Sequence, residues 1–193
     1  MKEILRLCAV LTVIAAVSAG VLAFVSERTE EPIRNALREE TLSAVRSVLP
    51  PFDNRPDEDT VVLYEVVGTD TLETTFYRGR KNGLVVGAAF PVVSMEGYSG
   101  EIAVMVGVDT LGVVRGVEVL RHLETPGLGA KIETAAFRNQ YEGKSLSEPA
   151  EWAVTKDGGT FVPITGATIS SRAVTKAIAA GLKFFTDHRG EIL

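Results

Sequence analysis

The first strong pattern in the chain is an apolar run near its start. Leu7 to Val25 (LCAVLTVIAAVSAGVLAFV) contains no charged residue. A helix of about 19 residues is roughly 28 Å long, close to the ~30 Å thickness of the hydrocarbon core of a bilayer. This pattern predicts one membrane-spanning helix within residues 1–26. A cleaved signal peptide is the alternative because Ser18, Ala19 and Gly20 are small, but its apolar core is typically shorter, so we expect the span to be retained.

The charges around the apolar run predict its orientation. Lys2 and Arg6 precede the run and are offset only by Glu3. Because positive residues favour the cytoplasmic side, we expect a cytoplasmic N-terminus and an extracytoplasmic main domain. Cys8 lies before the apolar core and does not end it, so we expect no lipoprotein anchor there, only a thiol buried in the span.

The next segment, residues 27–60, reads as an amphipathic helix followed by a linker. Apolar residues recur at helical spacing from Glu27 to Leu49, and Pro50-Pro51 stops the run. The stretch from Asp53 to Thr60 (DNRPDEDT) is too charged for a core and contains a proline, which is typical of a loop.

From residue 61 the pattern changes to strands rich in Val, Thr and aromatic residues. Short connectors between them (68–70, 80–83 and 109–112) favour hairpins, so the sheet should be largely antiparallel. The predicted strands are Val61–Val67, Thr71–Tyr77, Leu84–Phe90, Glu101–Val108 and Val113–Leu120.

Helical patterns follow the strands. We expect a helix over 130–141, a short strand near 152–156 and a last helix from about 168 to 186. The chain is therefore predicted to be an α+β protein: a transmembrane helix followed by a single, largely antiparallel sheet domain with flanking helices, over residues 61–193.

Composition narrows the chemistry. The 193 residues include 20 Lys and Arg against 25 Asp and Glu, a net charge of −5, which argues against a nucleic-acid partner. One cysteine excludes an intramolecular disulfide, a CxxC pair, a CxxCH haem site and a cysteine-ligated iron–sulfur cluster. With two histidines besides, we expect no transition-metal centre.

The segment that best fits a binding role is Ile164 to Ser171 (ITGATISS), which opens the last predicted helix. Hydroxyl groups are concentrated where orphan N–H groups and the helix dipole would receive a phosphate. The alternative is that Thr165, Thr168 or Ser171 only caps the helix.

Two further segments are candidate binding loops. Residues 124–129 (ETPGLG) contain Pro126, Gly127 and Gly129, and the glycines permit positive φ and close approach of a ligand to bare backbone. The loop matches neither a Walker loop nor a GxGxxG motif, and an ordinary strand-to-helix turn is the alternative. Residues 97–100 (GYSG) read as a hairpin turn. We assign no role to His122.

Taken together, the motifs GYSGEI, DTLG, ETPGLG and TGATISSRAV behind one span resemble a known family over nearly the whole chain. The sequence is similar to the FMN-binding domain of RnfG, the G subunit of the Rnf ferredoxin:NAD oxidoreductase, and of its relative NqrC from the sodium-pumping NADH:quinone oxidoreductase. Departures are small: Thr165 stands where Ser is common, and Ser170-Ser171 where Thr-Ser is common.

The resemblance implies covalent FMN. In this family the last residue of the S/T-G-A-T motif is esterified to the FMN phosphate, and the ETPGLG loop lies against the flavin. Carried over residue by residue, the ester residue is Thr168. The remaining expected cofactor contacts are Thr165, Gly166, Ala167, Ser171, Glu124, Thr125, Gly127, Leu128, Gly129 and Tyr98.

A threonine hydroxyl is a weak nucleophile, and no Ser/His/Asp arrangement is near it, so self-attachment is not expected. The resemblance implies a separate Mg-dependent flavin transferase with FAD as donor. It also implies a membrane-anchored subunit that passes electrons within an Rnf-type ion-translocating complex, with other membrane and redox subunits as partners and no stand-alone catalysis. The alternatives are a non-redox extracytoplasmic ligand-binding or regulatory protein, or the NqrC subunit; the short chain favours the Rnf type.

Overall fold

The computed structural model describes residues 1–67, 70–149 and 151–193. The chain divides into two compact units, Met1–Thr41 and Leu42–Leu193. The first unit consists of helix α1, which runs from Lys2 to Val48 and so continues into the second unit. By length and composition α1 can cross a membrane, and the side chains of its apolar window are exposed. The apolar run and the amphipathic segment predicted after it thus form one continuous helix, which ends before Pro50.

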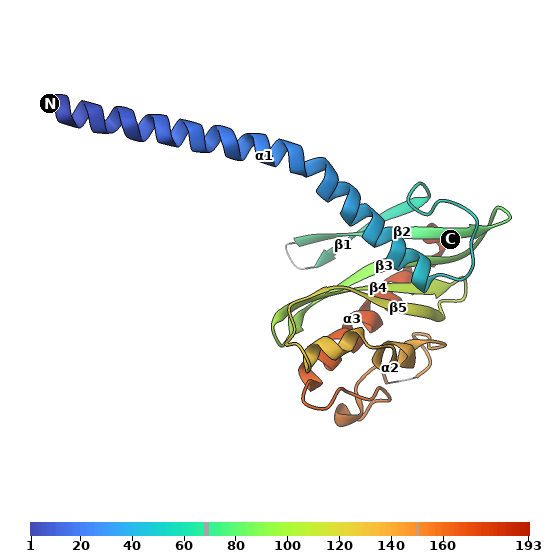
Figure 1. Cartoon of the computed structure of the whole chain (residues 1–193). Coiled ribbons are helices and arrows are strands. Elements are labelled where there is room, and N and C mark those ends of the chain that lie inside the picture. Colours follow the sequence, from blue (N-terminus) through green and yellow to red (C-terminus); the bar gives the residue numbers. More distant parts are fainter. Residues whose placement is uncertain (68–69, 150) are drawn as a thin grey trace. The chain divides into compact units, whose positions relative to one another are not determined.

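The second unit is built on an antiparallel meander with the strand order β1-β2-β3-β4-β5 (Figure 1). This confirms the predicted strands, and β3 continues seven residues further than expected because its pairing with β4 extends to Gly97 and Gly100. The predicted connector at 68–70 lies partly outside the described residues. The strands are β1 Thr60–Val67, β2 Asp70–Lys81, β3 Leu84–Gly97, β4 Gly100–Asp109 and β5 Val114–His122.

Strand β4 is buried on both faces because helical segments cover both sides of the sheet. Its side chains alternate, as a strand requires. Ile102, Val104, Val106 and Val108 join the large core under helix α3 (Thr168–Asp187). Met105 faces the other way and packs with the last turn of α1 in a smaller core. The sheet is therefore a rigid centre that fixes the loops at its ends.

The last predicted helix is confirmed, since α3 runs from Thr168 to Asp187 and is followed by the short α4 (Arg189–Ile192). The helix predicted over 130–141 is wrong as a single element. The chain forms η1 (Gly129–Glu133), α2 (Ala135–Arg138) and η2 (Asn139–Tyr141). Thr134 is extended, with φ −68° and ψ 142°, and this interrupts the helical hydrogen bonding.

The strand predicted near 152–156 is also wrong. A short helix, η3 (Thr155–Asp157), occupies this place, and Val154 forms a single bridge with Phe161. We call residues 154–161 the 154–161 loop. Both of its ends are buried, because Val154 and Phe161 are core residues. The strand-like composition of residues 152–156 therefore anchors one end of a loop and does not add a strand to the sheet.

Candidate functional site

The start of α3 is formed by a tight turn. The Ala167 N–H donates to the Ile164 carbonyl, 2.9 Å away, and Gly166 at the third position of this turn has φ +82°. That position takes positive φ in type II turns, which explains the glycine of the TGAT motif. Ala167 is the N-cap residue and makes no side-chain capping hydrogen bond.

The hydroxyls at this helix start have other partners. Ser171 is buried; its Oγ donates to the Ala167 carbonyl (2.9 Å) and accepts from the Ile164 N–H (3.0 Å). Thr168 Oγ1 instead accepts a hydrogen bond from Lys156 Nζ, 3.0 Å away. Thr165 is exposed. The hydroxyl of Thr168 thus does not cap the helix. For Thr168, the hypothesis that this helix start receives a phosphate therefore remains.

The ETPGLG loop uses the same kind of turn. The Leu128 N–H donates to the Thr125 carbonyl (3.2 Å), and Pro126 and Gly127 occupy the two central positions. Gly127 has φ +77°, as a type II turn with Pro and Gly requires. Gly129, where glycine would also permit positive φ, does not adopt it. That glycine is needed for space: a Cβ there would lie 2.3 Å from Glu124 Oε2 and 2.9 Å from Ser170 Oγ.

Glu124 ties three segments of the chain together. Glu124 is 4% exposed, and its carboxylate accepts hydrogen bonds from Ser170 Oγ on α3 at 2.7 Å and from the Ser99 N–H of the β3–β4 turn at 3.1 Å. Gly97 also leaves room for it, since a Cβ there would lie 2.7 Å from Glu124 Oε1. A buried carboxylate needs such partners, and these hydrogen bonds hold the three segments against one another.

These segments enclose a pocket of about 560 Å³. Eight of the eleven predicted site residues line it, although they come from three distant parts of the sequence. Thr165, Ser171 and Gly127 lie outside the lining, and Ile169 and Ser170 join it. The lining residues are Tyr98, Glu124, Thr125, Leu128, Gly129, Gly166, Ala167, Thr168, Ile169 and Ser170.

The pocket lining combines large apolar side chains with polar groups. Tyr98, Leu128 and Ile169 are large side chains that remain 70%, 47% and 46% exposed. Exposed apolar groups that converge on one cavity are typical of a surface that a planar ligand covers. The Thr168 residue belongs to the same lining.

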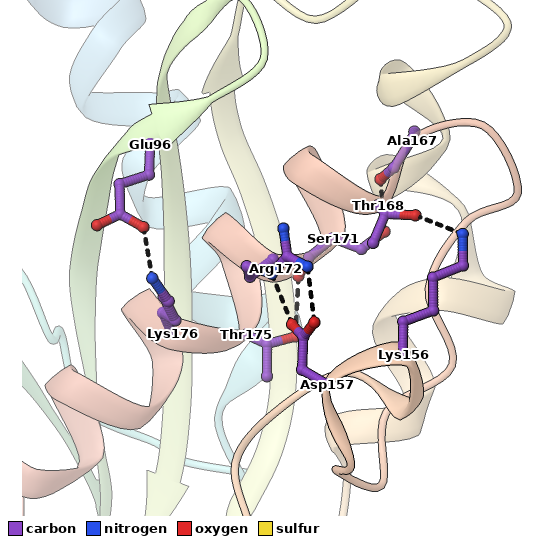
Figure 2. A network of polar contacts seen from close by, with 9 residues as sticks. All are labelled: Glu96, Lys156, Asp157, Ala167, Thr168, Ser171, Arg172, Thr175 and Lys176. Carbon is purple, nitrogen blue, oxygen red and sulfur yellow. Dashed lines mark hydrogen bonds and ion pairs between the residues drawn. The ribbon is translucent and has the colours of Figure 1, made fainter.

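A polar network surrounds Thr168 (Figure 2). Besides the Lys156 contact, Asp157 accepts two hydrogen bonds from the Arg172 guanidinium, at 2.6 and 2.7 Å. These hydrogen bonds and the arginine charge hold the pKa of the Asp157 carboxyl below its ordinary value of 3.8. The 154–161 loop is thereby fastened to the first turns of α3.

Sequence reasoning missed Lys156, Asp157 and Arg172. Charged residues directly before Gly158-Gly159 were visible, but nothing local indicated that this loop folds back over the TGAT motif. His122, to which we assigned no role, supports the loop from outside the pocket. Its Nδ1 accepts from the Glu124 N–H (3.0 Å), so its Nε2 carries the proton and donates to Glu133 Oε1 (2.8 Å).

Comparison with known proteins shows which class of protein has this fold and these motifs. The FMN-binding domain family matches residues 97–183, which include all three pocket segments. Two crystal structures share the fold. The C subunit of the Na⁺-translocating NADH-quinone reductase from Parabacteroides distasonis is 24% identical, with a TM-score of 0.51 over 61% of this chain and 63% of that one. Shewanella oneidensis NqrC is 18% identical, with a TM-score of 0.53 over 77% and 71% of the two chains.

Sequence relatives narrow the class further. The G subunit of the ion-translocating oxidoreductase complex of Pseudomonas aeruginosa is 37% identical over 203 aligned positions, covering 100% of this chain and 93% of the relative. Its counterpart in Aliivibrio fischeri is 36% identical, covering 95% and 91%. The chain belongs to the family of G subunits of ion-translocating oxidoreductase complexes, and the resemblance noted in the sequence is confirmed.

Proposed function

We propose that this protein is a membrane-anchored flavoprotein subunit that carries FMN in the pocket between the ETPGLG loop and the start of α3. The observation that carries the proposal is the convergence of three segments, separated by 25 and 46 residues, on one pocket that includes Thr168. The membership in the G-subunit family and the match to the FMN-binding domain support the same assignment.

The residues present fit FMN. A volume of about 560 Å³ lies within the ~300–1,000 Å³ range of pockets for ligands of this size. The apolar side chains of Leu128, Ile169 and Tyr98 suit an isoalloxazine ring. Thr168 and Lys156 offer an oxygen and a positive charge for a phosphate.

We further propose that the cofactor is covalent. Thr168 Oγ1 forms a bond to the flavin-side phosphorus of FAD, the bond from that phosphorus to the bridging oxygen breaks, and AMP leaves with that oxygen. The hydroxyl proton passes to a base on a separate flavin transferase, because the described residues around Thr168 include no histidine or free carboxylate in contact with its hydroxyl.

When bound, FMN supplies electron transfer, and the protein supplies binding and orientation. Glu124 fixes the pocket segments, Gly129 leaves space for its carboxylate, and Thr168 keeps the cofactor from diffusing away. We infer that the chain passes electrons within an Rnf-type ferredoxin:NAD oxidoreductase complex, alongside its membrane and redox subunits.

The proposed topology has a cytoplasmic N-terminus and a single span within residues 1–26. Residues 27–60 form the connection, and residues 61–193 form an extracytoplasmic FMN-binding domain. Lys2 and Arg6 before the apolar run support this orientation. Protease treatment of spheroplasts tests it: the domain should be digested without lysis, and protection until lysis would contradict the orientation.

Thr168→Ala tests the attachment. Coexpression of the full chain with a flavin transferase should give a fluorescent band on a denaturing gel and the mass of one FMN ester, and the variant should lose both. Thr186→Ala is the matched control, because it removes a threonine hydroxyl of the same helix that donates to the Leu182 carbonyl and lies outside the pocket lining, so it should leave attachment intact. An unchanged flavin mass on Thr168→Ala would refute the proposal.

A further inference from the structure

We propose that Lys156 is a positioning residue for the covalent attachment: its ammonium fixes Thr168 Oγ1 before the transfer and lies beside the phosphodiester oxygens afterwards. The inference rests on the proposed attachment of FMN at Thr168. The observation behind it is the hydrogen bond from Lys156 Nζ to Thr168 Oγ1, 3.0 Å long, which joins the 154–161 loop to the start of α3 (Figure 2).

The 154–161 loop holds this lysine in place although its side chain is exposed. Val154 and Phe161 anchor the ends of the loop in the core, and two hydrogen bonds link them: Thr155 N–H to the Phe161 carbonyl (2.8 Å) and Phe161 N–H to the Ala153 carbonyl (3.2 Å). Gly159 permits the tight closure, because a Cβ there would lie 2.0 Å from the Ala153 oxygen.

The residue next to Lys156 completes the placement. Asp157 and Arg172 form a bidentate ion pair, a geometry that fixes direction as well as distance. Arg172 is one turn after Thr168 on α3, so the pair joins the loop to the turn that carries the acceptor hydroxyl. Asp157 thus acts through Lys156 and does not itself touch Thr168.

The charges around Thr168 single out this lysine. Arg172 is paired with Asp157, and Lys176, one turn further along α3, is paired with Glu96 at 2.8 Å. Within the described part of the chain, Lys156 has no carboxylate partner. Its charge is therefore available to a phosphodiester, which carries one negative charge.

The direction of the hydrogen bond also suits the chemistry. Because Oγ1 accepts from the ammonium, the hydroxyl hydrogen points away from Lys156, towards a base on the transferase. A second lone pair of Oγ1 stays free to attack phosphorus. Lysine thus orients the nucleophile without removing its proton.

The test measures initial rates of flavin incorporation into the full chain in detergent micelles, with purified transferase, Mg²⁺ and FAD. Lys156→Ala should slow incorporation about three- to tenfold, as expected for one charge-assisted hydrogen bond at an exposed site. Lys156→Arg should restore much of the rate. Lys176→Ala is the matched control, because it removes an exposed lysine of α3 that pairs with Glu96 and does not contact Thr168 in the described structure, so it should leave the rate unchanged.

A double-mutant comparison separates positioning from general folding. Asp157→Asn should slow incorporation as well, and adding it to Lys156→Ala should cause little further loss, since both changes remove the same contact. In the mature protein, the phosphorus-31 resonance of the ester should shift in Lys156→Ala and stay unchanged in Lys176→Ala.

The outcomes are distinguishable. Flavinylation of Lys156→Ala at the rate of the unmutated chain, with an unshifted phosphorus resonance, overturns the role of Lys156 alone. An additive effect of the double variant overturns the link through Asp157. Flavin on Thr168→Ala, or its absence from the unmutated chain, overturns the proposed attachment and this inference with it.

Discussion

Gly129→Ala tests whether the pocket depends on space for the Glu124 carboxylate. The added Cβ would lie 2.3 Å from Glu124 Oε2, a separation that Cβ atoms essentially never show, so the carboxylate must move. That movement breaks or stretches its hydrogen bonds from Ser170 Oγ and the Ser99 N–H. The three pocket segments would then lose the group that joins them.

The expected cost follows from these contacts. A hydrogen bond to a charged group contributes about 1.5–3 kcal/mol, and overpacking a buried site costs about 1–3 kcal/mol. Replacing glycine by alanine at an unstrained position returns roughly 0.4–1 kcal/mol through the unfolded state. With one such hydrogen bond lost, we expect the free energy of unfolding to fall by about 1.5–5.5 kcal/mol. With a urea slope of roughly 2 kcal/mol/M, the midpoint should fall by about 0.8–2.8 M.

Urea unfolding of the full chain in detergent micelles measures this change. Trp152, the one tryptophan, is the reporter, because its ring packs against Phe161 with centroids 4.8 Å apart. Gly190→Ala is the matched control: it lies in helix α4, has no positive φ and has open space at its Cβ. Its midpoint should change little.

The clash also predicts a coupling. In a Glu124→Ala background the 2.3 Å contact with the carboxylate is gone, while the 2.9 Å contacts with the Cβ of residue 124 and with Ser170 Oγ remain, so Gly129→Ala should cost less there than in the unmutated chain. Equal costs of Gly129→Ala with and without Glu124, or a midpoint as high as that of Gly190→Ala, would refute the reasoning.

Three further predictions concern other parts of the domain. Gly127→Val opposes φ +77° at a cost of about 1–3 kcal/mol and should shift the flavin absorption band or midpoint potential while Thr168 stays modified; an unchanged spectrum and potential would make the loop a plain turn. Thr175→Val removes the 2.8 Å partner of the buried Tyr141 hydroxyl and should lower the free energy of unfolding by about 1–3 kcal/mol in urea titration, whereas Tyr141→Phe should cost less. Burial raises the pKa of the Asp59 carboxyl, but hydrogen bonds from two arginines outweigh this and hold it below 3.8, so its stabilisation is present above that pH and lost as the pH falls through the lowered pKa. Asp59→Asn should thus be less stable at pH 7, with the difference decreasing as the pH falls below 3.8; a difference that stays constant over that range would contradict this assignment.

The sequence by itself determined the local elements. An uncharged run of helical length, strands with short connectors and a helix starting at TGAT follow from periodicity and turn chemistry within a few residues. The glycine at 127 also belongs here, since it occupies the third position of a turn that needs positive φ. The resemblance of these motifs to a known family added the cofactor and the expected site residues.

The local sequence pattern predicted the wrong secondary structure in two segments where tertiary packing determines the backbone conformation. Residues 130–141 have helical composition, but burial of Ile132, Phe137 and Tyr141 is achieved by three short helices with an extended Thr134 between them. At 152–156 a strand-like composition instead anchors a loop in the core through its end at Val154.

Only the tertiary structure decided how the site is assembled. The hydrogen bond between Glu124 and Ser170 joins residues 46 positions apart, and the contact between Lys156 and Thr168 depends on a loop that the core and the Asp157–Arg172 pair hold in place. Gly129 shows the difference most directly: the sequence indicated only that a glycine there permits positive φ or close approach of a ligand, whereas the folded chain requires the absence of a Cβ beside a buried carboxylate. Such requirements depend on distances between segments, and a linear pattern carries no information about them.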